Sequence, residues 1–241
     1  AVTDAGLLAV PCDITDTGQV DAAFTRIEET LGPVEVLVAN AGITRDGLVL
    51  RMKDDDFSEV LDANLTGGFR VARRAVRSMM RSRWGRIVFV SSIAGRIGQT
   101  GQANYAAAKA GIAALTVSTA RALASSGVRA NAICPRARTA MTAQVFGEDT
   151  SGQEVDPYSP EHVAPVVAYL ASPAAARITG QVFVVYGGMV ALVAAPVLEE
   201  RFDKSGTLWT AEDLDKQLGG YFSDRDPSVG FAADSIMKLS V

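Results

Sequence analysis

Tyr105 and Lys109 are spaced for acid–base chemistry, because four positions on a helix bring two side chains to one face. A tyrosine ordinarily titrates near pH ~10, and a neighbouring ammonium group stabilises its phenolate. The pair therefore indicates a tyrosine whose pKa Lys109 lowers toward neutrality. The alternative is an exposed helix that carries an amphipathic tyrosine and a solvated lysine.

Two further polar residues are candidates for the same site. Ser92 ends an apolar run and precedes Tyr105 by 13 residues, so one loop can bring its hydroxyl beside the phenol and a bound carbonyl. Asn64 lies in a helical segment next to Gly67 and Gly68, where its amide can hold a kink or a water. The alternatives are an ordinary strand-to-loop turn at Ser92 and a local backbone hydrogen bond at Asn64.

The elements that must position these residues alternate along the chain, as in βαβ units with a parallel sheet. We expect strands at residues 7–10, 34–38, 86–90, 128–133 and 182–185. We expect helices at residues 19–31 with Thr15 or Asp16 as the cap, 53–80, 104–124, and from Ser159 to Ala171. Ligands of such sheets bind beyond the carboxyl ends of the strands. Those ends carry Asp13, Asn40-Ala41-Gly42, Ser91-Ser92 and Pro135-Arg136.

Composition narrows the class of protein. The 241 residues are 48% apolar with a net charge of −4, which disfavours disorder and general nucleic-acid binding. No apolar run has the length of a membrane span, and the start of the chain does not read as a signal peptide. Cys12 and Cys134 form no disulfide framework, so we expect a cytoplasmic protein. His162 is the only histidine, and no cluster has metal-ligand spacing, so no metal site is expected.

Five motifs occur together in one order: Asn40-Ala41-Gly42, Asn64-Leu65, Ser92, Tyr105 and Lys109. With the stretch from Gly101 to Gly111, they resemble the short-chain dehydrogenases/reductases, and within them most closely the 3-oxoacyl (β-ketoacyl) carrier-protein reductases. The resemblance covers residues 7–188. It implies an α/β fold, a Rossmann-like doubly wound parallel sheet. It also implies a nicotinamide cofactor, NADP or NAD, with NADPH slightly favoured.

The resemblance assigns a role to each catalytic candidate. Tyr105 would be the general acid in reduction and the base in oxidation, and Lys109 would lower its pKa and bind the nicotinamide ribose. Ser92 would orient the carbonyl, and Asn64 would anchor a water that relays protons to Lys109. The residues implied to bind the cofactor are Asp13, Ile14, Asn40, Ala41, Gly42, Tyr105, Lys109, Pro135 and Thr139.

The beginning of the chain departs from the family, which starts with a strand, a Gly-rich turn and a helix that holds the pyrophosphate. No such turn precedes Asp13. We expect this first βα unit and most of the second to be missing from the sequence. In that case residues 1–4 are the end of the second strand, and Asp4 would bind the ribose and favour NAD. A chain of these residues alone is then expected to bind either cofactor weakly.

Other departures lie near the end of the family domain. Arg136 replaces the usual glycine after Pro135, and Tyr186 replaces the usual aspartate before Gly187-Gly188. Arg136 and Arg138 would contact phosphates or lie in a solvated loop. From Val190 onward the alternation stops, which predicts a domain at residues 1–189 and a C-terminal extension at 190–241. Similar tails occur in longer family members that act on acyl-CoA or steroid-like substrates.

Surface charge bears on the partners. A basic cluster at Arg70, Arg73, Arg74, Arg77, Arg81, Arg83 and Arg86 is either a solvated helix face or a docking site for an acidic acyl carrier protein. Of two basic positions used for docking in relatives, Arg83 matches one and Ser126 replaces the other, so coenzyme A thioesters stay open. In the family that the sequence resembles, the helices equivalent to residues 53–80 and 104–124 pack against partner subunits. Small residues permit this close packing here, so the resemblance implies a homodimer or homotetramer; they include Ala106, Ala110, Ala113 and Ala114.

Three functions remain open at this stage. The first is NAD(P)H-dependent reduction of a 3-oxoacyl thioester to the 3-hydroxyacyl form, as in fatty-acid metabolism. The second is NAD-dependent oxidation of a hydroxyacyl-CoA or a hydroxysteroid. The third is a non-catalytic family member that has lost cofactor binding.

Overall fold

The computed structural model describes residues 7–142, 146–147 and 155–225. It divides the chain into two compact units, Ala1–Val193 and Ala194–Val241. The boundary expected after residue 189 falls within a strand, β5 (Met189–Leu192), which pairs with the sheet of the first unit. The sheet therefore continues past Val190, because the turn at Gly187-Gly188 connects the preceding strand to β5 as an antiparallel hairpin.

The first unit contains a five-stranded sheet in the order β1-β2-β3-β4-β5. Its strands are β1 (Val36–Ala39), β2 (Gly85–Val90), β3 (Val128–Pro135), β4 (Val182–Tyr186) and β5. The first four are parallel, and only β5 runs antiparallel to its neighbour. This parallel sheet with its connecting helices confirms the expected Rossmann-like α/β fold.

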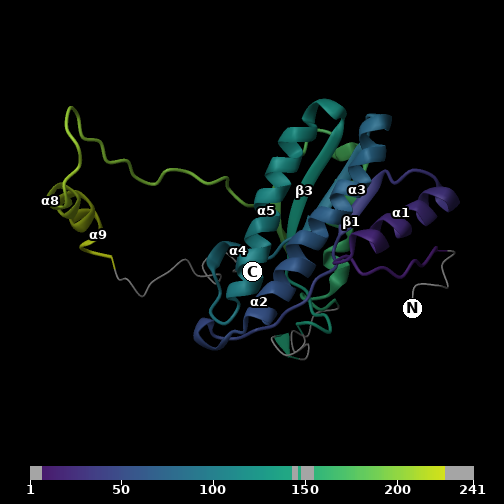
Figure 1. Ribbon diagram of the computed structural model, residues 1–241, viewed down its shortest axis with the longest axis horizontal. Coiled ribbons are helices and arrows are strands. Elements are labelled where there is room, and N and C mark those ends of the chain that lie inside the picture. Colours follow the sequence, from purple (N-terminus) through teal and green to yellow (C-terminus); the bar gives the residue numbers. More distant parts are fainter. Residues whose placement is uncertain (1–6, 143–145, 148–154, 226–241) are drawn as a thin grey trace. The chain divides into compact units, whose positions relative to one another are not determined.

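Helices cover both faces of this sheet. On one face, α3 (Gly67–Ser82) packs on β1 and β2, and α5 (Ala103–Leu123) packs on β3 beside α3 (Figure 1). On the other face, Val88 of β2 joins Leu170 of α7 (Ala164–Ala171) in a buried cluster with Ile133 and Val185. Because side chains alternate along a strand, Ile87 and Phe89 point to the opposite face from Val88. All three are at most 1% exposed, so both faces of the sheet are buried.

The helices mostly follow the expected ranges. Asp16 caps α1 (Thr17–Leu31) by accepting a hydrogen bond from the Gln19 amide, which settles the alternative with Thr15. The segment led by Ser159 begins as a 3₁₀ turn, Pro160–His162, before α7. Short helices that the sequence did not predict are α4 (Ala94–Ile97) and the 3₁₀ turns Val49–Arg51, Ala124–Ser126 and Pro173–Ala175.

The strand expected at residues 7–10 is wrong. Residues 7–13 form no strand, and Leu7 is 54% exposed. Backbone hydrogen bonds to a neighbouring strand define a β-strand, and in the described part of the chain β1 pairs only with β2. An apolar run without such a neighbour stays irregular.

The long helix expected at residues 53–80 is helical throughout but changes type. It consists of α2 (Asp54–Leu61), a π-helical segment Asp62–Thr66 and α3. Gly67 and Gly68 are therefore the first two residues of α3. A Cβ at Gly67 would lie 2.6 Å from Ile14 Cδ1, so the glycine lets Ile14 pack directly on the helix.

The second unit has its own small helical arrangement. Thr210 and Asp213 form a reciprocal capping box at the start of α8 (Ala211–Leu214). A π-helical turn, Asp215–Gly219, and α9 (Gly220–Phe222) continue it. The ring of Tyr221 packs edge-on against Phe202 and Phe222. In the described residues of both units, no helix is long and apolar enough to cross a membrane.

Candidate active site

The polar residues expected at strand ends gather along one edge of the sheet. Asn40-Ala41-Gly42 follow β1, Ser91-Ser92 follow β2, and Arg136 follows β3. Because these strands are parallel and adjacent, their carboxyl ends share that edge. The Ser91 amide donates to the Ile133 carbonyl, 2.7 Å away, which aligns the ends of β2 and β3. This is the edge at which open α/β sheets bind ligands.

Tyr105 and Ser92 come together from two elements. Tyr105 lies in the first turn of α5, and Ser92 lies directly after β2. The Ser92 side chain lies near enough to the phenol to lower its pKa, and its Oγ accepts a hydrogen bond from the Ala94 amide at 3.2 Å. The structure thus brings the two residues together as their spacing predicted.

Lys109 lies one turn after Tyr105 on the same helix, and its side chain is only 4% exposed. Its Nζ lies 5.4 Å from the centre of the Tyr105 ring and donates a 2.9 Å hydrogen bond to the Val90 carbonyl. Burial lowers the pKa of Lys109 to about 8. The ammonium is therefore mostly charged at neutral pH but close to titration.

The pKa of Tyr105 shifts upward, opposite to the direction that the sequence predicted. Burial of the phenol raises the pKa, and the hydrogen bond from Ser92 offsets this only in part. The Lys109 ammonium donates its hydrogen bond to the carbonyl of Val90, at the end of β2, and its Nζ lies 5.4 Å from the centre of the phenol ring. In this state Tyr105 keeps its proton at neutral pH and is a potential proton donor.

Asn64 lies in the π-helical segment, and such segments often occur at functional sites. Its Nδ2 donates to the carbonyls of Ile43 at 2.8 Å and Val60 at 2.9 Å. Its Oδ1 is buried and has no hydrogen-bond partner in the part of the chain that the structure describes. Gly42 borders this oxygen so closely that a Cβ there would clash with it and would lie 3.6 Å from Lys109 Nζ. An unpaired buried acceptor beside a lysine is a place for a bound water or hydroxyl.

Burial of the Lys109 ammonium predicts that the stability of the fold depends on pH. Because the folded-state pKa of Lys109 is about 8 and the ordinary value is 10.5, the unfolded chain holds more protons between these pH values. The free energy of unfolding should therefore rise across this window, by at most about 3 kcal/mol from this group. Methionine does not titrate, so Lys109→Met should lack this dependence of the free energy of unfolding on pH. In urea unfolding, the free energy of unfolding of the wild type should therefore rise relative to that of Lys109→Met from pH ~8 to ~10.5.

Lys53→Met controls for the loss of one positive charge, because Lys53 is exposed. A stability difference between wild type and Lys109→Met that stays constant over the window would contradict the burial of the ammonium.

Two residues that sequence reasoning missed position α5, the helix that carries Tyr105 and Lys109. Asn104 is fully buried, its Oδ1 accepts from the Tyr105 amide at 2.8 Å, and its Nδ2 donates to the carbonyls of Arg45 and Asp56. Gly95 of α4 touches α5 so closely that a Cβ would lie 2.6 Å from the Lys109 carbonyl carbon. The role of Asn104 could have been predicted, because asparagine is common at the start of a helix. Nothing in the sequence indicated the role of Gly95.

The residues expected at the adenosine side lie directly after β1 and beside the start of α3. The Asp13 carboxylate accepts hydrogen bonds from the amide and hydroxyl of Thr15, which lower its pKa. Asn40 and Ala41 are exposed after β1, and Ile14 packs at Gly67. Asp4 lies outside the described residues, so its expected role in cofactor preference stays a prediction.

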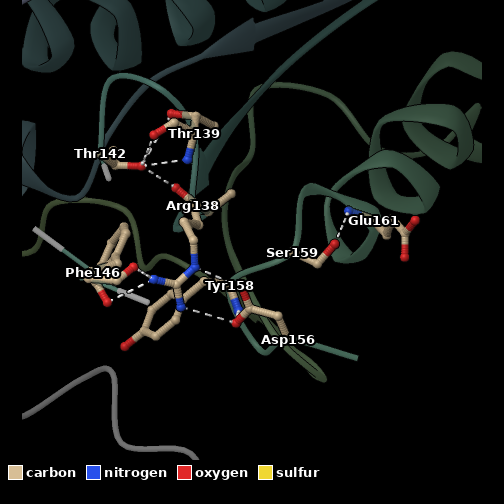
Figure 2. Close-up of polar contacts among 10 residues, drawn as sticks. Arg138, Thr139, Thr142, Phe146, Asp156, Tyr158, Ser159 and Glu161 are labelled. Atoms are coloured by element: carbon tan, nitrogen blue, oxygen red, sulfur yellow. Dashed lines mark hydrogen bonds and ion pairs between the residues drawn. The ribbon is translucent and has the colours of Figure 1, made fainter. Parts of the chain in front are cut away.

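Past β3, Thr139 is exposed, its amide donates to Thr142 Oγ1 at 2.8 Å, and its own hydroxyl lies 3.2 Å from the same oxygen. Figure 2 shows that Arg138 is not a solvated residue. Its guanidinium donates to both carboxylate oxygens of Asp156 and to the Phe146 carbonyl. The Arg138 amide also donates to the carbonyl of Tyr158 at 2.6 Å. Arg138 therefore joins the two ends of the segment between β3 and α7.

The basic cluster is partly neutralised by acidic neighbours. Arg70 pairs with Asp62 at 2.8 Å, and Arg74 pairs with Glu28 at 2.6 Å. Arg83 donates to the Ser125 carbonyl at 2.9 Å. These contacts reduce the positive charge that α3 presents for docking, although Arg77 and Arg81 are exposed. Among the described residues, no group of His, Cys, Asp and Glu side chains is arranged to hold a metal.

The fold and site define the class of protein, and comparison with known proteins agrees. A family model described as enoyl-(acyl carrier protein) reductase matches residues 1–190. A crystal structure of a short chain dehydrogenase from Mycobacterium avium superposes with a TM-score of 0.78 at 35% identity, over 91% of this chain and 75% of that one. The chain belongs to the short-chain dehydrogenase/reductase family and is an oxidoreductase of that type.

Two relatives differ in how much of the chain they match. The 3-oxoacyl-[acyl-carrier-protein] reductase MabA of Mycobacterium tuberculosis is 45% identical over 192 residues, covering 76% of this chain and 77% of the relative. The hydroxyacyl-CoA dehydrogenase ChsB1 of Mycobacterium tuberculosis is 47% identical over 250 aligned positions, covering 99% of this chain and 78% of the relative. The alignment with ChsB1 therefore includes the C-terminal unit, whereas the alignment with MabA covers about three quarters of the chain.

The family implies a nicotinamide cofactor, and the residues present fit one on its nicotinamide side. The buried, unpaired Oδ1 of Asn64 lies with Gly42 and Lys109 beside Tyr105. The exposed residues after β1 and the carboxylate of Asp13 offer polar groups for the adenosine side. These residues suit the ribose hydroxyls of a dinucleotide.

Proposed function

We propose that this protein interconverts 3-oxoacyl and 3-hydroxyacyl thioesters with NADPH or NADH, with reduction of the 3-oxoacyl form as the first candidate. The observation that carries the proposal is the juxtaposition of Ser92 and the Tyr105 phenol, with Lys109 one turn further along α5. A bound nicotinamide would supply the hydride. The chain's own residues would orient the carbonyl and provide the proton.

Each residue has a task in this proposal. The Ser92 hydroxyl would donate a hydrogen bond to the carbonyl oxygen, and the Tyr105 phenol would protonate that oxygen as it is reduced. The upward pKa shift of Tyr105 keeps the phenol protonated, which suits proton donation. Lys109, together with a water at Asn64 Oδ1, would return a proton to the phenol.

The second candidate is oxidation of a hydroxyacyl-CoA. The alignment of the C-terminal unit with the hydroxyacyl-CoA dehydrogenase favours it, because the carrier-protein reductase alignments cover only about three quarters of the chain. The same alignment favours coenzyme A over an acyl carrier protein as the thioester carrier. Partial neutralisation of the basic cluster by Asp62 and Glu28 points the same way.

A homo-oligomer is also part of the proposal. Ala110 and Ala114 are exposed on α5, where they can contact a second subunit, whereas Ala106 and Ala113 are buried within their own chain. The small exposed residues would permit close helix packing across a symmetric interface.

The test is a turnover assay in both directions with all four cofactor forms. A 3-oxoacyl group and its 3-hydroxyacyl counterpart are each supplied on coenzyme A and on an acyl carrier protein. We expect turnover of the coenzyme A thioesters. Turnover confined to the hydroxyacyl-CoA with NAD⁺ would favour the second candidate, and preference for the carrier protein would contradict the choice of carrier. Absence of turnover in every combination would support a non-catalytic member of the family.

A further inference from the structure

Arg136 and Tyr186, the two departures from the family motifs at the ends of β3 and β4, lie in contact. The Arg136 guanidinium carbon is 5.2 Å from the centre of the Tyr186 ring. It is also 5.4 Å from the ring of Phe146 and 5.6 Å from that of Tyr158. The Arg136 amide donates to the Val185 carbonyl at 3.0 Å, which places its backbone beside the end of β4.

The three rings form a packed aromatic wall. Phe146 and Tyr158 stack at 4.3 Å between centroids, and Tyr158 lies 5.0 Å from Tyr186. The Arg138–Asp156 pair holds the segment that carries Phe146 and Tyr158 (Figure 2). The guanidinium of Arg136 is therefore held in place by rings, which attract a cation through their faces.

Ring faces leave the in-plane N–H donors of a guanidinium available. Among the residues that the structure describes, no oxygen accepts a hydrogen bond from the Arg136 side chain, and no carboxylate pairs with it. Arg138, two residues along, shows the contrast, because Asp156 neutralises it. A fixed, planar cation with open donors is suited to bidentate binding of a phosphate.

The position of Arg136 in the fold puts its guanidinium next to the site formed by Ser92, Tyr105 and Lys109. Arg136 is two residues beyond Cys134, whose buried thiol lies near Ser91 and interacts electrostatically with Lys109. Burial raises the pKa of that thiol to about 11, so Cys134 brings no negative charge to the edge. An anion at Arg136 would come from a ligand.

We propose that Arg136 is a binding residue for a phosphate group of a ligand at this edge of the sheet. The proposal rests on the proposed function for its ligands, because coenzyme A thioesters and nicotinamide dinucleotides both carry phosphates. The aromatic wall of Phe146, Tyr158 and Tyr186 fixes the guanidinium, and the departure from glycine at position 136 supplies the charge.

Arg136→Met tests the assignment, since methionine retains an apolar stem for the rings and removes the donors. The KM for a 3-oxoacyl-CoA should rise about 10- to 100-fold, with little change in kcat. The KM for the same acyl group on N-acetylcysteamine, which has no phosphate, should stay unchanged. If the phosphate belongs to the cofactor, the Kd values of NAD(H) or NADP(H) rise instead. Arg77→Met, on the exposed face of α3, controls for the general loss of charge.

Calorimetric titration with free coenzyme A and with each dinucleotide separates this proposal from the proposed function. Weaker binding of one of them by Arg136→Met than by wild type supports the phosphate site even if no thioester is turned over. Equal rises in KM for both thioesters would show that Arg136 only orders the segment, and unchanged KM and Kd values would likewise overturn the proposal.

Discussion

Tyr105→Phe is expected to lower turnover about 10²- to 10⁴-fold, the usual contribution of a positioned general acid. Phenylalanine keeps the ring beside Lys109 and removes only the hydroxyl next to Ser92. Steady-state kinetics in both directions measure the effect, and cofactor titration shows whether binding survives. The fold should be unaffected, because the phenol is only half-buried and its backbone is held by Asn104.

Tyr169→Phe is the matched control, since it removes a tyrosine hydroxyl on α7 from a side chain that is 49% exposed. It should turn over substrate like the wild type. Near-normal turnover by Tyr105→Phe on every accepted substrate would refute the acid–base assignment.

The spacing of Tyr105 and Lys109 could be predicted because it depends only on helix geometry. Both lie on α5 within one turn, as four-residue spacing requires. The pKa values could not be predicted, since they depend on how deeply the folded chain buries each group. Lys109 is 4% exposed and points to the Val90 carbonyl, and this contact exists only once β2 is in place.

Most strands could be predicted for a similar reason. The apolar runs at β1 to β4 each have a neighbouring strand, whereas Leu7 and the residues after it have none among the described residues and form no strand. The antiparallel β5 was missed because its pairing depends on the turn at Gly187-Gly188. Local pattern predicts a strand only where tertiary pairing completes it.

The polar details of the site depend on contacts distant in sequence. The sequence alone allows Arg138 to lie in a solvated loop, because its partner Asp156 is eighteen residues away. The π-helical turn at Asn64 is equally hard to predict, because it leaves the Oδ1 atom buried and unpaired. Such a turn is unfavourable locally, so its presence at the site agrees with a functional role for Asn64.

The closest approach between α4 and α5 determines how Ser92 meets the catalytic helix. Gly95 follows Ser92 by three residues, and its amide donates to the Ser92 carbonyl at 3.1 Å. A Cβ at Gly95 would lie 2.5 Å from the Ala110 nitrogen and 2.6 Å from the Lys109 carbonyl carbon. Both are backbone atoms of α5, which cannot rotate out of the way as a side chain would. An added methyl group must therefore push the two helices apart.

Gly95→Ala is expected to lower turnover about 10²-fold, because a shift of about 1 Å between catalytic groups can cost that much. It should also destabilise the fold by about 1–3 kcal/mol through overpacking. Gly98→Ala in the same short segment is the control. Gly98 has a φ of +65° and open space around its Cβ position, so alanine there brings backbone strain without a clash. Thermal unfolding should thus report a loss of stability in both variants, while kinetics should report a loss of turnover only in Gly95→Ala. Wild-type turnover by a folded Gly95→Ala protein would show that the spacing of α4 and α5 does not hold Ser92 in register with Tyr105.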